Sequence, residues 1–311
     1  PPIYRGLQMN PSIHDSFPRA HSYFEATARQ RISQLLDSGS FHEFLTPENS
    51  QPSPHLATFD IPSAFDDGVI IGEGRINSVY VHVIAQEGQF MGGSVGEIHG
   101  AKIVGLLKRA AREKPAAVLF LADSGGVRLH EANAGLIAIS EIMRAVLDAR
   151  VAGVPVFALI GGSCGAFGGI GIVSRLCSAI IISEEGRLGL SGPEVIETVA
   201  GVEEFDSKDR ALVWRVTGGK HRYLMGDCEM LVEDNVASFR EGVMHLLAGW
   251  REPEQSLELY RTEQQRLAAR LKKFEGMRDG KQVWAAIGVP APDNVPILSA
   301  PEIVALRKKL S

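Results

Sequence analysis

The chain has 311 residues, of which 45% are hydrophobic, and a formal net charge of -5 at pH 7. Such a chain can bury a substantial core, as one large domain or as two smaller ones. A mildly acidic chain gives no electrostatic reason to expect nucleic-acid binding, and three scattered cysteines are too few for a disulfide framework. No apolar run approaches the length that spans a bilayer, and the first thirty residues lack a signal-like apolar core. We therefore expect a cytoplasmic protein.

The N-terminal part of the chain is rich in Pro, Ser and His. Its pattern predicts one helix, Tyr23–Leu36, and we expect residues 1–66 to form an N-terminal arm. The segment "SPHLATFDIPSAFDDG" has the composition of a linker with turns. It leads into a main domain that we expect over residues 67–250.

The main domain is predicted to begin with two paired strands. From Val69 to Ala85, β-branched residues surround a central Gly/Asn break, which is typical of a hairpin. A glycine-rich turn, "EGQFMGGSVGE", follows. The next segment, "IHGAKIVGLLKRAARE", places apolar residues on one helical face.

A strand–turn–helix pattern then occurs twice. The first copy is the apolar run Ala116–Ala122, the turn "DSGG" and a helix over Arg128–Arg150. The second is Val154–Ile160, a glycine-rich turn and a helix that ends at Leu176, before a further strand at 178–182. Continuous apolar strands that alternate with helices are covered on both faces, so the sequence predicts an α/β fold.

The C-terminal part is predicted to be helical. We expect helix over residues 207–222, and a helical tail over residues 251–311. Within 254–274, one apolar stripe is interrupted only by Gln264, and it comprises Leu257, Tyr260, Leu267, Leu271 and Phe274. Charges of both signs decorate this helix, which argues against membrane binding. We expect the stripe to pack on its own domain, with a partner subunit as the alternative.

Two ligand-binding motifs are absent. Neither glycine turn contains G-x-G-x-x-G, because the run that begins at Gly169 lacks the third glycine, and no G-x-x-x-x-G-K-[ST] occurs. His42-Glu43 and His130-Glu131 lack a second His four residues after the first, and there is no Cys-x-x-Cys. We predict no metal site.

One pentapeptide suggests a serine hydrolase. Gly161–Gly165 matches G-x-S-x-G between a predicted strand and helix, the place of a nucleophile elbow, and it would make Ser163 the nucleophile. Candidate partners from later in the chain are Glu203, Asp206, Asp227, His221 and His245. None has a distinctive setting, and a chain rich in Gly and Ser produces this pattern readily by chance.

The glycine turns can also act through their backbone. A Gly-Gly pair between a strand and a helix presents unpaired N–H groups at the positive end of the helix dipole. Two such turns on neighbouring strands could direct donors at one developing oxyanion. The alternative is that these glycines only permit tight turns and close packing. Spacing alone does not distinguish the two.

Several motifs together resemble a known family. "GSVGEIHGAKIVGLLKRA", "DSGGVRLHEA" and "GGSCGAFGGIGIVSRLCSAIIISEEGRLGLSGPEVIE" occur in the order found in carboxyltransferase subunits of acyl-CoA carboxylases, members of the crotonase superfamily. The resemblance covers about residues 67–230. "EANAGLIAISEIMRAVLDAR" and "GVEEFDSKDRALVWRVTGGKHRY" are similar, more narrowly, to beta subunits of malonate decarboxylases. The implied fold is a single crotonase-like domain, a ββα spiral.

The resemblance also implies partners. The chain lacks the four-cysteine zinc ribbon of bacterial acetyl-CoA carboxylase beta subunits and the second crotonase domain of the fused enzymes. A gamma-like crotonase subunit would therefore supply the other half of the active site. An acyl carrier protein (delta) subunit would present the malonyl thioester on a triphosphoribosyl-dephospho-CoA-derived prosthetic arm, and an alpha (transferase) subunit would complete the complex. No cofactor is expected on this chain itself.

The resemblance implies site residues as well. By similarity to the crotonase arrangement, oxyanion donors come from two glycine pairs: Gly125 or Gly126, and Gly168 or Gly169. Candidate proton donors near these turns are Ser163, Cys164, His130 and Glu131. Arg128 could hold the departing carboxylate, although we favour a solvated or helix-capping cation. Contacts with the carrier arm are expected from the turn before the first helix and from that helix: Gly93, Ser94, Gly96 and Lys102.

A basic segment suggests where the carrier protein docks. Residues 208–222 contain five cations and one acid, Asp209, and the cations are Lys208, Arg210, Arg215, Lys220 and Arg222. Because acyl carrier proteins are usually acidic, our hypothesis is a docking patch. An ordinary charged helix face is the alternative.

These observations together predict an enzyme of the lyase class. Decarboxylation of malonyl-carrier protein to acetyl-carrier protein leaves an enolate oxygen, which converging N–H donors would stabilise. One alternative is a carboxyltransferase subunit that passes the malonyl carboxyl group to biotin. The others are the serine hydrolase and a non-catalytic scaffold that shapes the partner's site.

Overall fold

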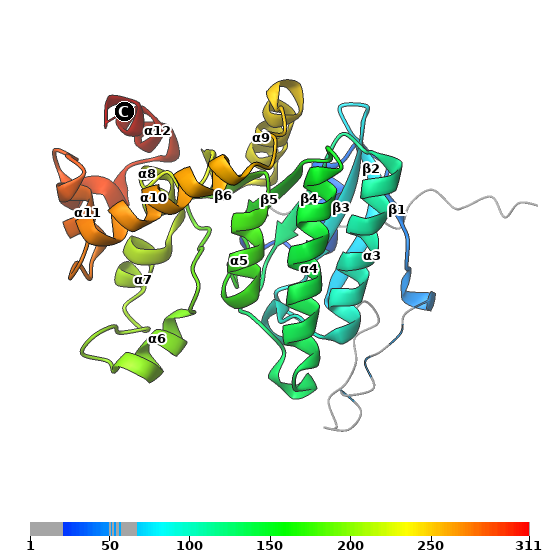
Figure 1. Ribbon diagram of the computed structural model, residues 1–311, viewed down its shortest axis with the longest axis horizontal. Helices are drawn as coiled ribbons and strands as arrows, with labels where there is room; N and C mark the ends of the chain where they lie inside the picture. The colour runs from blue at the N-terminus through cyan, green and yellow to red at the C-terminus, as the bar shows by residue number, and fades with distance from the viewer. Residues whose placement is uncertain (1–20, 50, 52, 54–55, 57–66, 311) are drawn as a thin grey trace, which may run out of the picture.

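The computed structural model describes residues 21–49, 51, 53, 56 and 67–310. In this part of the chain, seven strands form one sheet in sequence order (Figure 1). They are β1 (His42–Glu43), β2 (Val69–Ile76), β3 (Val79–Gln86), β4 (Val118–Ala122), β5 (Val156–Ile160), β6 (Ala179–Ser183) and β7 (Met230–Val232). Strands β1 to β3 pair antiparallel, and β3 to β7 pair parallel.

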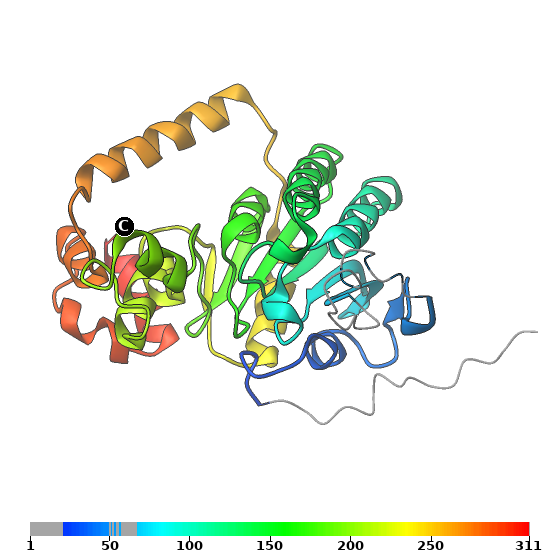
Figure 2. The same cartoon turned by 90° about the horizontal axis from the view of Figure 1, so that it is seen from below.

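Helices cover both faces of this sheet. The helices of the described residues are α1 (Ala28–Leu35), α3 (Glu97–Glu113), α4 (Ala134–Val151), α5 (Gly168–Leu176), α6 (Pro193–Ala200), α7 (Arg210–Thr217), α8 (Gly219–Leu224), α9 (Val236–Gly249), α10 (Leu257–Lys273), α11 (Gly280–Ala286) and α12 (Ala300–Leu310). Figure 2 shows α3, α4 and α5 on one face and α1 and α9 on the other. Among the described helices, none combines the length and apolar character needed to cross a bilayer.

The apolar strand runs belong to two cores, one on each face of the sheet. In β4, Val118, Phe120 and Ala122 pack in the core beneath α3, α4 and α5. Leu119 and Leu121 point the other way, into the core beneath α1 and α9. Because successive strand residues face opposite sides, a strand between two cores must be apolar throughout. The expected α/β architecture is observed.

The N-terminal helix belongs to this domain. It begins at Ala28 rather than at Tyr23, because Thr27 and Gln30 form a capping box that satisfies the first N–H groups. Its Ile32 and Leu35 lie in the same core as Phe239 of α9. The described part of the expected N-terminal arm therefore packs on the sheet. The rest of that arm, 1–20, and most of the expected linker lie outside the described residues.

Helix α10 does not pack as the sequence suggested. None of its residues is buried, and Leu257 and Leu271 are 65% and 78% exposed. Figure 2 shows this helix, in orange, standing away from the sheet and reaching toward the C-terminal helices. An ion pair between Arg270 and Asp227 ties it to the domain at 2.6 Å. The expectation that its apolar stripe packs on its own domain is wrong, because charges rather than apolar contacts hold it.

The remainder of the C-terminal tail contributes to the main core. Trp284 of α11 and Ile303 of α12 are 1% and 0% exposed, and both belong to the core that also contains β4. The tail therefore helps to close the end of the sheet next to β7.

Candidate active site

The two predicted glycine turns lie side by side. Strands β4 and β5 are parallel neighbours, so both turns leave the same edge of the sheet. The pairing continues into the turns, where the Ser124 N–H donates to the Gly165 carbonyl oxygen at 2.6 Å and the Phe167 N–H donates to the Ser124 carbonyl oxygen at 2.9 Å. A Cβ added to Gly168 would lie 3.1 Å from the Cα of Gly126. The structure thus brings the two turns into contact.

A buried ion pair holds these turns together. The Asp123 carboxylate accepts from Arg31 Nη1 at 2.8 Å and from the Cys164 N–H at 2.7 Å. Asp123 and Arg31 are each 1% exposed. A Cβ on Gly162 would lie 2.1 Å from the Asp123 Cγ, so this position must be glycine. One carboxylate therefore fixes both turns relative to α1.

Three of the four predicted glycine amides already have hydrogen-bond partners. The Gly125 N–H donates to the Gly92 carbonyl oxygen at 2.9 Å, and the Gly168 N–H donates to the Leu190 carbonyl oxygen at 2.8 Å. The Gly126 N–H donates to Ser124 Oγ at 3.2 Å. Only the Gly169 N–H has no partner among the described residues.

Two further amides at these turns are unpaired. Val127 follows Gly126, and its N–H has no partner in the described part of the chain. The same is true of Ile170, which lies with Gly169 in the first turn of α5. The start of a helix is where N–H groups lack internal acceptors and where the helix dipole favours negative charge. We call Val127, Gly169 and Ile170 the free-amide set. The sequence motifs point to glycine amides and do not indicate Val127 or Ile170.

Ser163 and Cys164 lie on the turn after β5. Ser163 is exposed, and its carbonyl oxygen accepts from Arg187 Nη2. The Cys164 thiol donates to the Gly88 carbonyl oxygen at 3.4 Å. Burial and the nearby Asp123 charge raise the pKa of this thiol, so Cys164 is protonated at neutral pH.

The histidines nominated for a hydrolase triad give that hypothesis no support. His245 lies on α9, which covers the opposite face of the sheet from α5 (Figure 2). His221 lies on α8, where burial, with the Arg222 charge beside it, lowers its pKa to about 3. An imidazole with so low a pKa binds a proton too weakly to act as an effective general base near pH 7.

Arg128 is buried rather than solvated. It is 1% exposed, and its Nη1 pairs with Glu131 Oε1 at 2.8 Å. Its Nη2 donates to the carbonyl oxygens of Asp67 and Ser94 at 3.2 and 3.0 Å. The favoured expectation of a solvated or helix-capping cation is wrong, because a local carboxylate and two carbonyls compensate its burial. Glu131, 0% exposed, also accepts from the Glu97 N–H, while His130 is exposed.

The residues expected to touch the carrier arm have structural roles. Gly93 has φ +65°, and a Cβ there would lie 1.8 Å from the Asp123 carbonyl oxygen. Gly96 is the N-cap of α3, and Ser94 Oγ donates to the Met91 carbonyl oxygen at 2.7 Å. Lys102 is 7% exposed, and its Nζ donates to the Val69 carbonyl oxygen at 2.5 Å. Their contact with a carrier arm stays a prediction.

The basic segment 208–222 does not form one patch. Arg215 pairs with an aspartate at 2.8 Å, Lys220 with a glutamate at 3.3 Å and Arg222 with an aspartate at 3.3 Å. Lys208 and Arg210 remain on the exposed surface. Three of the five cations are compensated within the chain. Most of the positive charge of the predicted docking patch is therefore not available to a partner.

One group of side chains could hold a metal ion, although the sequence predicted none. Candidate ligand atoms of Glu73, His82 and Glu113 lie within 4.8 Å of one another. Tyr80 and Arg109 already engage them: the Tyr80 hydroxyl donates to Glu73 at 2.6 Å and Arg109 pairs with Glu113 at 2.7 Å. The group lies on β2, β3 and α3, away from the glycine turns.

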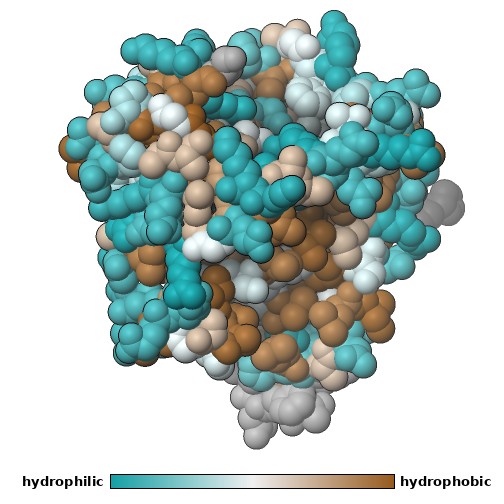
Figure 3. Space-filling view, turned by 60° about the vertical axis from the view of Figure 1, so that its left-hand side comes forward, coloured by the Kyte–Doolittle hydropathy of each residue, from teal (hydrophilic) through white to brown (hydrophobic). Residues whose placement is uncertain are grey.

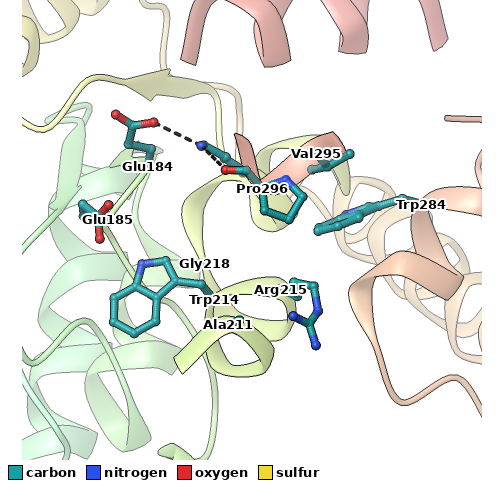
Figure 4. Close-up of a pocket in the computed structure, with 10 residues that line it drawn as sticks. Glu184, Glu185, Ala211, Trp214, Arg215, Gly218, Trp284, Val295 and Pro296 are labelled. Atoms are coloured by element: carbon teal, nitrogen blue, oxygen red, sulfur yellow. Dashed lines mark hydrogen bonds and ion pairs between the residues drawn. The ribbon is translucent and has the colours of Figure 1, made fainter. Parts of the chain in front are cut away.

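Two pockets lie beside the turns that follow β5 and β6. One, of about 260 Å³, is lined by Ser163, Asp123, Arg31 and neighbouring residues of the N-terminal segment. The other, of about 130 Å³, lies between α7 and the C-terminal segment, with Trp214 and Trp284 in its lining (Figure 4). The indole N–H groups of both tryptophans are buried without a hydrogen-bond partner.

Comparison with known proteins identifies relatives over most of the chain. The family model of the carboxyl transferase domain matches residues 19–256. The malonyl-S-ACP:biotin-protein carboxyltransferase of Malonomonas rubra is 41% identical over 310 residues, which are 93% of this chain and 96% of that protein.

Two solved structures share the fold. A Pseudomonas malonate decarboxylase hetero-tetramer in complex with malonate contains a chain that is 39% identical, with a TM-score of 0.78 over 85% of this chain and 96% of that one. A Pseudomonas malonate decarboxylase MdcD-MdcE hetero-dimer contains a chain that is 36% identical, with a TM-score of 0.64 over 80% and 97%. The similarity therefore extends through both glycine turns.

Proposed function

Because the chain belongs to the carboxyl transferase domain family, we propose that it acts on the malonyl thioester of an acyl carrier protein. The chemistry is cleavage of the bond between the α-carbon and the free carboxyl group. The Malonomonas rubra relative, named for a malonyl-S-ACP substrate, and the two malonate decarboxylase structures support this proposal.

The observation that carries the proposal is the free-amide set where the two turns meet. Loss of CO₂ from a malonyl thioester moves an electron pair onto the thioester oxygen, which becomes an enolate oxyanion. Preorganised N–H donors stabilise such charge, and removing one donor typically costs about 2.7–4 kcal/mol of transition-state stabilisation. We assign the two donors to Val127 and Gly169, because their N–H groups have no partner among the described residues. Ile170 is the neighbouring alternative on α5.

Decarboxylation and carboxyl transfer share this enolate. They differ only in whether the carboxyl group leaves as CO₂ or reaches biotin. We propose decarboxylation, as in the two Pseudomonas enzymes. Transfer to biotin is the second candidate, since the Malonomonas rubra relative is named for it.

The enolate carbon must then gain a proton. Cys164 is a candidate donor, because its raised pKa keeps the thiol protonated at the turn beside Asp123. Ser163, exposed on the same turn, is the other candidate.

The proposed enzyme works with partner subunits. Both solved relatives come from hetero-oligomers. Figure 3 shows apolar side chains gathered around a hollow on one face of this chain. Large apolar residues are exposed on the segment before α4, on α4 and around α6, and they include Leu129, Leu136, Ile137, Leu190, Val195 and Val199. We propose that a gamma-like crotonase subunit completes the site. The carrier protein would bring the substrate on its triphosphoribosyl-dephospho-CoA-derived arm, after loading by an alpha-type transferase.

A reconstitution experiment tests the shared site. CO₂ release from malonyl-carrier protein is measured with this chain alone, with a gamma-like subunit alone and with both. We expect release only from the mixture, because the exposed apolar residues indicate a surface that is incomplete without a partner. Full release by the gamma-like subunit alone would exclude a catalytic role for this chain, and full release by this chain alone would exclude a shared site.

A further inference from the structure

Arg187 places a cation beside the turn that connects β5 to α5. It lies four residues after the end of β6, and its carbonyl oxygen accepts from the Ala166 N–H at 2.8 Å. Its Nη2 donates to the carbonyl oxygen of Ser163. The backbone and the guanidinium of Arg187 therefore both contact the turn that connects β5 to α5.

This guanidinium differs from three other arginines of the same domain that are buried or partly buried. Arg31, Arg128 and Arg222 each pair with a carboxylate, at 2.8, 2.8 and 3.3 Å. Within the described residues, no carboxylate oxygen lies within 4.0 Å of an Arg187 nitrogen. Its Nε is buried without a hydrogen-bond partner. Burial of a cation is costly unless an anion compensates it, and here it lowers the pKa of Arg187.

Aromatic rings hold this cation in place. The Arg187 Cζ lies 4.8 Å from the centroid of the Trp214 ring and 5.8 Å from that of Phe167. Trp214 comes from α7, where it also lines the pocket of Figure 4. Phe167 is the N-cap of α5, two residues before Gly169. The rings thus hold the guanidinium beside the turn that leads into α5, the helix that carries the Gly169 amide.

We propose that Arg187 binds the free carboxylate of the carrier-bound malonyl group. This inference rests on the proposed function, which supplies a substrate with one carboxylate. A planar guanidinium matches a carboxylate in a bidentate pair, and such pairs strengthen where water is excluded. With the carboxylate at Arg187, the thioester oxygen is placed toward the amides of Val127 and Gly169.

The reaction itself releases this contact. The bond between the α-carbon and the carboxylate carbon breaks, its electron pair moves to the enolate, and the carboxylate leaves as neutral CO₂. Arg187 neither gains nor loses a proton. It acts in binding and orientation, so its removal should raise KM for the malonyl substrate more than it lowers kcat.

The test compares ligands with and without the carboxylate. Binding of malonyl-carrier protein and of acetyl-carrier protein is measured for the complex containing the wild-type chain or Arg187→Gln, together with KM and kcat for CO₂ release. We expect Arg187→Gln to weaken malonyl binding and to raise KM by about 10- to 100-fold. This fold-change corresponds to the free energy that hydrogen bonds to a charged group typically contribute. Binding of acetyl-carrier protein should not change.

Two further variants serve as controls. Arg251→Gln removes an exposed arginine outside the predicted docking patch, whose Nη1 donates to the Trp250 carbonyl oxygen at 2.9 Å, and it should leave both affinities unchanged. Arg187→Lys keeps the positive charge but loses the bidentate geometry of the guanidinium, so it should recover part of the malonyl affinity. If Arg187→Gln does not fold, the comparison is made with Arg187→Lys instead.

Equal weakening of malonyl and acetyl binding, or no change in either, would overturn the role of Arg187. A wild-type complex that neither binds malonyl-carrier protein nor cleaves it would instead overturn the proposed function.

Discussion

Replacement of Val127 by Pro is expected to lower kcat for CO₂ release by about 10²- to 10³-fold, the typical effect of deleting one oxyanion donor. Proline has no N–H, and the Val127 N–H makes no hydrogen bond to the described residues, so no internal bond is lost. The preceding Gly126 has φ +143°, outside the helical conformation that proline disfavours in its neighbour. Initial rates of the reconstituted complex measure the effect.

Val127→Ala is the matched control. It keeps the N–H and removes most of the side chain, so we expect kcat within a few-fold of the wild-type value. A Val127→Pro enzyme that folds normally and keeps its full kcat would show that this amide is not a donor. Equal losses in both variants would assign the effect to the side chain instead.

Loss of the Arg31–Asp123 pair should have the largest effect on stability. Replacement of Arg31 by Met leaves the Asp123 carboxylate buried without its cation, which typically lowers the free energy of unfolding by about 3–5 kcal/mol. Both side chains are 2% exposed, and the same carboxylate accepts the Cys164 N–H. Urea unfolding followed by circular dichroism measures the change.

An exposed ion pair in the same chain provides the comparison. Arg144 and Glu141 pair on α4 with side chains that are 61% and 43% exposed. Arg144→Met should change the free energy of unfolding by less than about 1 kcal/mol, because water screens such pairs. Similar losses for Arg31→Met and Arg144→Met would contradict the structural importance assigned to the buried pair.

The fold could be predicted because its central strands carry a strong local signal. The run Ala116–Ala122 is observed as β4 over Val118–Ala122, and Val154–Ile160 as β5 over Val156–Ile160. Two-sided burial makes each strand apolar throughout, and turn residues mark its ends. The comparisons confirm the resemblance to malonate decarboxylase subunits and the crotonase-like fold.

The candidate site could be predicted only in part. The sequence located both turns, because Gly-Gly pairs between strand and helix are a local pattern. Which amides stay unpaired depends on distant acceptors, such as Gly92 for the Gly125 N–H and Leu190 for the Gly168 N–H. Arg31 and Asp123 are 92 residues apart, so no local pattern indicates their pairing.

Apolar periodicity was also ambiguous for α10. The spacing of Leu257, Tyr260, Leu267 and Leu271 is the spacing of a core-facing helix, yet all four are exposed in the chain by itself. A pattern of this kind predicts a buried face without showing which chain buries it.

The central claim is that this chain, with its partner, cleaves the malonyl thioester to CO₂ without biotin. The most direct measurement is CO₂ release from malonyl-carrier protein by the reconstituted complex, with every biotinylated protein removed. The proposed function predicts stoichiometric CO₂ and acetyl-carrier protein under these conditions. No CO₂ without biotin, and transfer of the carboxyl group once a biotinylated carrier is added, would contradict decarboxylation and establish a carboxyltransferase.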